Sequence, residues 1–151
     1  MGRLNISGRR PEGSELMALY IDEAAKGGHF RMQKITPTGY RGATGDSTLD
    51  LIGFDAQVLK DAKLRLWLIN QRPPVDEQGR YLDATKTGAN ATVEIFEHVR
   101  GEKTMKHVKT FADPEIYSGN GIAGLNDGSF VLSNDHTSKG MYLVSRHLSL
   151  C

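Results

Sequence analysis

The sequence has 151 residues, of which 38% are hydrophobic and 25% charged, with a net charge of +1. This composition excludes a disordered chain, and we expect residues 1–151 to form one globular domain with a modest core. No basic stripe with interleaved aromatic residues and no apolar run of membrane-spanning length occurs, so we expect neither nucleic acid binding nor a membrane span. The single cysteine, Cys151, has no internal partner for a disulfide.

Four short segments in the first half of the chain have the length and pattern of β-strands. Residues 16–22 form an apolar run whose period also allows a short helix, whereas residues 30–35 alternate between polar and apolar. Further strands are predicted at 49–58 and 64–70. Gly53 interrupts the first of these two, which indicates a β-bulge or a close approach of another backbone segment.

Alternation is strongest in the second half, where turn sequences separate the apolar runs. Arg100-Gly101 and Asn126-Asp127-Gly128 have the composition of tight turns between antiparallel strands. Residues 137–151 are ambiguous, because residues 141–150 also suit a helix. The strands predicted in this half are residues 91–99, 105–111, 122–125 and 129–134, and loops are predicted at 36–47 and 71–90.

The chain also contains a weak internal repeat. Ile52-Gly53-Phe54, a turn and LRLWLIN resemble Asn120-Gly121-Ile122, a turn and SFVLSN, and the second strands end at Asn70 and Asn134. About eight short strands with little helix are typical of an all-β sandwich, barrel or propeller. Four-stranded units at a long period favour propeller blades. A second similarity relates 16–22 and 30–35 to 91–99 and 105–111.

Several of these segments together resemble the paraoxonase/arylesterase family, including its fungal members. The similarity covers about residues 16–140 and leaves residues 1–15 and 141–151 unexplained. Its most specific element is Thr92-Val93-Glu94-Ile95-Phe96, followed at a matching distance by Asn120 and then by Asn134-Asp135-His136. The matching stretches are LDLIGF from Leu49, LRLWLIN, ATVEIFEHV, HVKTF, GNGIAGL and SFVLSNDH.

The resemblance implies a six-bladed β-propeller with calcium in its central tunnel, which hydrolyses lactones and aryl esters and, in some members, organophosphate esters. This chain would supply half a blade, one full four-stranded blade and another half blade, as a truncated member. The substrate implied is a small ester or lactone. Family members are secreted or membrane-associated, whereas residues 1–14 lack the apolar middle of a signal peptide, so the compartment stays open.

The resemblance also implies which residues line the site. Asn120 matches a calcium ligand, although Gly119-Asn120-Gly121 is equally ordinary turn chemistry. Calcium takes about 6–8 oxygen ligands, several of them carboxylates. The family's acidic ligands have no counterpart here, so we expect no tight calcium site in this chain alone.

The catalytic residues that the resemblance implies are incomplete. Asp135 and His136 match an Asn-Asp-His stretch near the active site, where a carboxylate could orient an imidazole. Ile52 and Gln71 stand where the family has a histidine pair, and neither can act as a general base. Loss of general-base catalysis lowers a rate by roughly 10²–10⁴-fold. We therefore expect this chain alone to be inactive as an arylesterase or lactonase.

A second hypothesis is a non-catalytic β-module that binds a partner or a small ligand. An eight-stranded up-and-down barrel would suit the length, because closure removes free strand edges. If the chain is instead part of a propeller, we expect exposed blade faces and self-association through them. We expect Trp67 in the core, and His98 and His107 at the surface.

Overall fold

The computed structural model describes residues 8–22 and 29–135, and these residues form eight strands and one short helix. Six strands make one sheet in the order β1-β2-β6-β5-β4-β3, and β7 and β8 form a separate hairpin. The elements are β1 (Leu16–Tyr20), β2 (Arg31–Thr38), β3 (Leu51–Val58), β4 (Lys63–Arg72), α1 (Ala84–Thr87), β5 (Asn90–Val99), β6 (Thr104–Phe111), β7 (Gly119–Gly124) and β8 (Phe130–Asn134).

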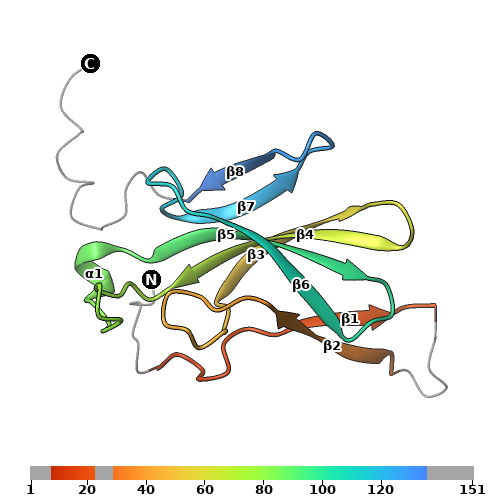
Figure 1. Ribbon diagram of the computed structural model, residues 1–151, viewed down its shortest axis with the longest axis horizontal. Helices are drawn as coiled ribbons and strands as arrows, with labels where there is room; N and C mark the ends of the chain where they lie inside the picture. The colour runs from red at the N-terminus through yellow and green to blue at the C-terminus, as the bar shows by residue number, and fades with distance from the viewer. Residues whose placement is uncertain (1–7, 23–28, 136–151) are drawn as a thin grey trace.

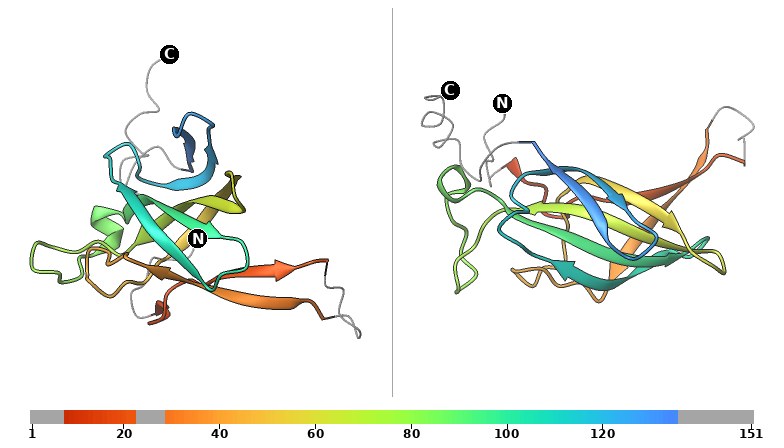
Figure 2. Two further views of the ribbon diagram at one scale, coloured as in Figure 1. Left: turned by 45° about the vertical axis from the view of Figure 1, so that its right-hand side comes forward. Right: turned by 90° about the horizontal axis from the view of Figure 1, so that it is seen from above.

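A four-stranded antiparallel meander, β3 to β6, forms the middle of the molecule (Figure 1). The β1–β2 hairpin lies on one side of this meander and the β7–β8 hairpin on the other, which gives three layers (Figure 2). β2 joins β6 in parallel, over only three residue pairs from Thr36 to Thr38. The large sheet therefore curls at this junction, and β1–β2 passes back beneath the meander.

The strand order is not that of the eight-stranded up-and-down barrel considered above. In such a barrel each strand pairs with its sequence neighbours, and the first strand pairs with the last. Here β2 pairs with β6 rather than β3, and among the described residues β1 and β8 do not pair. The all-β class is confirmed, and the sheet is curled but not closed.

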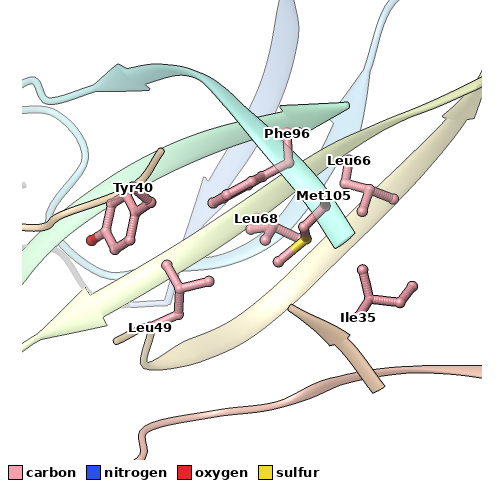
Figure 3. Close-up of a cluster of buried hydrophobic side chains, with 7 residues drawn as sticks. All are labelled: Ile35, Tyr40, Leu49, Leu66, Leu68, Phe96 and Met105. Carbon is pink, nitrogen blue, oxygen red and sulfur yellow. The ribbon is translucent and has the colours of Figure 1, made fainter. Parts of the chain in front are cut away.

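The core lies on both faces of β4 and β5, because alternate residues of these strands point in opposite directions. Leu66, Leu68 and Phe96 face the β1–β2 side, where the chain segment between β2 and β3 adds Tyr40 and Leu49 (Figure 3). On the other face, fully buried Trp67 and Val93 lie under the β7–β8 hairpin. Each face of the meander thus carries its own hydrophobic cluster, the first on the Phe96 side and the second on the Trp67 side.

The strands predicted from hydrophobic alternation are confirmed, and the apolar run at 16–22 is the strand β1. The predicted loop 71–90 contains the short helix α1, whose N-cap is Asp83; its carboxylate accepts a hydrogen bond from the Thr85 amide. The tail 137–151 lies outside the described residues. In the described ranges, no helix combines the length and apolar character that a membrane span requires.

At Gly53 the sequence predicted a β-bulge or a close approach of another backbone segment, and the structure has both. The β3–β4 register shifts between Leu51 and Gly53, so a β-bulge is present there. A Cβ atom added at Gly53 would lie 2.6 Å from the backbone oxygen of Asn120 on β7. Glycine is therefore required at this position because another strand passes directly over it.

Replacing Gly53 by alanine should destabilise the fold by about 1–3 kcal/mol, since the new methyl group must displace the backbone of β7. The free energy of unfolding from urea titration measures this loss. Gly8→Ala is the matched control, because a Cβ at Gly8 meets nothing within 4 Å. Equal stability of the two variants would contradict the close approach of β7 to β3.

Candidate functional site

The internal repeat seen in the sequence corresponds to two hairpins with the same irregularity. In β3–β4 the register shifts between Leu51 and Gly53, which makes Ile52 the extra, bulged residue. In β7–β8 the register shifts between Gly119 and Gly121, which makes Asn120 the bulged residue. Ile52 and Asn120 thus occupy equivalent positions at the start of the first strand of each hairpin.

The asparagines that end the second strands are also equivalent in their hydrogen bonds. Asn70 Oδ1 accepts a bond from the Asp50 amide at 2.8 Å, and Asn134 Oδ1 accepts one from the Ser118 amide at 3.0 Å. The residues that follow the two asparagines are also equivalent. The Gln71 backbone amide donates to the Asp50 carbonyl, and the Asp135 backbone amide donates to the Ser118 carbonyl, both at 2.8 Å. The two hairpins are therefore copies of one structural unit.

The bulged ends of the two hairpins lie against each other. The backbone oxygen of Asn120 lies over Gly53, and Gln71 Nε2 donates a hydrogen bond of 2.7 Å to the Gly119 carbonyl. The Asp135 backbone amide donates a hydrogen bond to the carbonyl of Ser118, which directly precedes Gly119. Asp135 therefore lies at the same end of the molecule. We call Ile52, Gln71, Asn120 and Asp135 the edge site.

The edge site contains the residues that the sequence singled out, but its chemistry is sparse. Ile52 is apolar and exposed, and the side-chain amide of Gln71 is hydrogen-bonded to a backbone carbonyl. Asn120 and Asp135 are exposed. His136 lies outside the described residues. The described residues contain no group of three or more His, Cys, Asp or Glu side chains able to hold a metal ion.

Asn134 serves the backbone rather than a ligand. Its Oδ1 accepts bonds from the amides of Tyr117 and Ser118, and its Nδ2 donates to the Glu115 carbonyl at 2.8 Å. The amide group therefore fixes the loop that leads into β7. In the Asn-Asp-His stretch, Asp135 is the described side chain that stays open to solvent.

A second polar cluster, which sequence reasoning missed, is built around Glu94 on β5. The residue is only 1% exposed. Its Oε1 accepts from the Thr92 hydroxyl at 2.7 Å, and its Oε2 meets the Thr110 hydroxyl and His107 Nε2, the latter at 3.0 Å. A carboxylate at this depth is tolerated because it is hydrogen-bonded from several directions.

The cluster continues through Asn70 to a buried arginine. Asn70 Nδ2 donates to the Tyr40 hydroxyl at 2.9 Å. Arg72, only 3% exposed in its side chain, binds both carboxylate oxygens of Asp46, at 2.7 and 2.6 Å. The Arg72 hydrogen bonds hold the pKa of the Asp46 carboxyl well below its ordinary value. Burial, and secondly the charge of Glu94, raises the pKa of the Tyr40 hydroxyl.

Glu94, Asn70, Arg72 and Tyr40 line a pocket of about 440 Å³ between the meander and the loop that joins β2 to β3. Tyr40, Arg41 and Gly42 form the loop side, while Glu94 and His107 are on the sheet side. The His107 ring also packs edge-on against Tyr40 and Phe96, which fixes its orientation. The pocket could therefore accept a small polar molecule next to an imidazole held by a buried carboxylate.

The expectation that both histidines lie at the surface is wrong. His98 is 5% exposed, and its Nδ1 lies 2.9 Å from the Thr104 carbonyl oxygen. His107 is half-buried and paired with Glu94. The signal that could have revealed this is spacing: Glu94, Phe96 and His98 share one face of β5, and that face carries a buried aromatic residue.

No protein-family model matches the sequence, and no curated protein matches it either.

Replacing Glu94 by glutamine should destabilise the protein by about 1.5–3 kcal/mol, because two hydroxyl groups lose a charged acceptor in a buried place. Glu97→Gln, three residues along the same strand, is the control. Its carboxylate pairs with Arg65 at 3.2 Å in a partly exposed position, so about 0–1 kcal/mol is expected. Urea unfolding at neutral pH measures both, and a larger loss for Glu97→Gln would refute the cluster's structural role.

Proposed function

We propose that this chain is a segment of a calcium-dependent ester or lactone hydrolase of the paraoxonase/arylesterase type, built from consecutive units of a β-propeller. The observation that carries the proposal is the matched pair of hairpins, with equivalent bulges at Ile52 and Asn120 and equivalent asparagine caps at Asn70 and Asn134. Repeated units with identical irregular features are typical of propeller blades.

The arrangement of the layers supports the same proposal. The β3–β6 meander corresponds to one complete four-stranded unit, and hairpins β1–β2 and β7–β8 cover its opposite faces. The first strands of successive units, β3 and β7, lie next to each other, as the inner strands of neighbouring blades do. The short parallel contact between β2 and β6 departs from a simple stack of blades.

The described residues do not fit a complete calcium site. Asn120 offers one side-chain oxygen in an exposed position, and Asp135 is the carboxylate of the edge site. About 6–8 oxygen ligands are needed, so further ligands must come from outside the described residues. We propose Asn120 as a partial calcium ligand, with Asp135 at the same end of the molecule, and no catalytic step through calcium follows for this chain. His136, which the resemblance also implies near the active site, lies outside the described residues.

Calcium should bind weakly and locally if the edge site is a partial metal site. In an NMR titration with calcium chloride, shifts should be confined to the amides of Gly53, Gln71, Asn120 and Asp135, with a dissociation constant weaker than about 10⁻³ M. Asn120→Ala should abolish these shifts, whereas Asn126→Ala, at the far turn of the same hairpin, should leave them intact. If calcium changes no chemical shift at the edge-site amides, the assignment is overturned.

The purified chain should not hydrolyse phenyl acetate at a rate that a chelator lowers. The reason is that Ile52 and Gln71 cannot accept a proton, and loss of a general base costs roughly 10²–10⁴ in rate. The measurement compares initial rates with calcium and with excess EDTA, against buffer alone. Steady turnover that EDTA abolishes would show that the chain carries a complete site, contrary to its assignment as a segment.

The Glu94 pocket favours a second candidate function, a β-module that binds a small ligand. Its volume of about 440 Å³ lies in the range of roughly 300–1,000 Å³ for ligand pockets. The same NMR spectra, titrated with phenyl acetate or a γ-lactone, separate the two candidates. Saturable shifts at Tyr40 and His107 support the ligand-binding module, and shifts at the edge site support the hydrolase segment.

A further inference from the structure

The two terminal hairpins of the described chain each have a strand edge without a partner. β1 pairs with β2 on one side only, and β8 pairs with β7 on one side only. An unpaired edge presents a row of free amide and carbonyl groups to an incoming strand. Among the described residues neither edge pairs with a further strand.

The internal repeat specifies which strand each edge would accept. β8 is equivalent to β4, and β4 pairs antiparallel with β5 along its whole length. The β1–β2 hairpin corresponds in sequence to β5–β6, and both are antiparallel pairs. Among residues 8–22 and 29–135, β8 thus has no partner equivalent to β5, and β1 has none equivalent to β4, so each edge matches the partner that the other edge would take.

The faces of the hairpins show the same complementarity. Ile122, Phe130 and Leu132 face the meander and pack on the Trp67 side. Their equivalents in β3–β4 are Phe54, Leu66 and Leu68, and on this face Phe54 is 59% exposed. The opposite face of β7–β8 carries Val131, equivalent to Trp67, which is 61% exposed. Among the described residues, the Phe54 face of β3 and the Val131 face of β7–β8 thus each lack a covering layer, and they lie on opposite sides of the stack of layers.

We infer that a second copy of this chain binds head to tail, with β8 of one copy pairing antiparallel with β1 of the next. The two half units then form one four-stranded sheet in the order β7-β8-β1-β2, like the meander β3 to β6 within each chain. Val131 of the first copy covers Phe54 of the second. The outer face of β1–β2, which exposes Met17, Leu19 and Met32, turns toward the first copy.

This contact is heterologous, because the two copies use different surfaces. A copy blocked at β1 still offers β8, and a copy blocked at β8 still offers β1. The inference does not depend on the hydrolase assignment, because it uses only the internal repeat, the strand edges and the apolar faces. It would hold equally for a ligand-binding module.

The test uses two variants that each block one surface. Leu19→Lys and Val131→Lys place a charge on an edge strand, which opposes strand addition. Both residues are at least half exposed in the single chain, so each variant should fold, as circular dichroism will verify. Light scattering after size exclusion should give 16.6 kDa for each variant alone. An equimolar mixture should double this mass, as a complex with one chain of each kind.

Tyr81→Lys is the matched control, since Tyr81 is 45% exposed but lies outside β1, β8 and the apolar faces of the two terminal hairpins, and it should assemble like the unaltered chain. Three results would overturn the inference. The unaltered chain could stay at 16.6 kDa at every concentration, which would assign these faces to a different polypeptide. The mixed variants could fail to combine. Val131→Lys could assemble alone, which would indicate a symmetric contact between β1–β2 hairpins.

Discussion

The close packing of the β7–β8 hairpin on the Trp67 face of the meander is the contact on which the rest of the structure depends. Trp67 is fully buried, and its ring lies 5.5 Å from that of Phe130. The strands approach so closely that added Cβ atoms at Gly53 and Gly124 would collide with Asn120 and with the indole ring. Aromatic side chains bury large areas, so this contact contributes much of the hydrophobic cluster on the Trp67 face.

Covering the meander on both faces has a consequence for its polar residues. β4 and β5 become central strands without a solvent-facing side, and polar groups on them need partners inside the protein. Asn70 therefore accepts a hydrogen bond from the Asp50 amide, Glu94 binds two hydroxyl groups and an imidazole, and Arg72 binds Asp46 in the loop between β2 and β3. The Glu94 pocket thus follows from the layered fold.

Local patterns in the sequence were sufficient for the strands, the bulge at Gly53 and the burial of Trp67, because alternation and glycine placement are properties of neighbouring residues. The short helix α1 after Asp83 was not predicted, because the sequence assigned residues 71–90 to a loop. The parallel contact of β2 with β6 and the burial of Glu94 were not readable, because both depend on segments far apart in the chain. Of the candidate site, Asn120 and Asp135 are placed, while His136 lies outside the described residues.

Comparison of the two equivalent hairpins separates structural residues from variable ones. A glycine directly after the bulged residue, Gly53 or Gly121, and an asparagine at the end of the second strand, Asn70 or Asn134, recur in both hairpins. The bulged residues and those after the caps differ, as Ile52 against Asn120 and Gln71 against Asp135. Positions whose side chains differ between the two hairpins are the ones that can carry chemistry in one unit and lose it in another. A search for function in this chain should therefore concentrate on the bulges and strand ends, where the backbone is shared and the side chains are not.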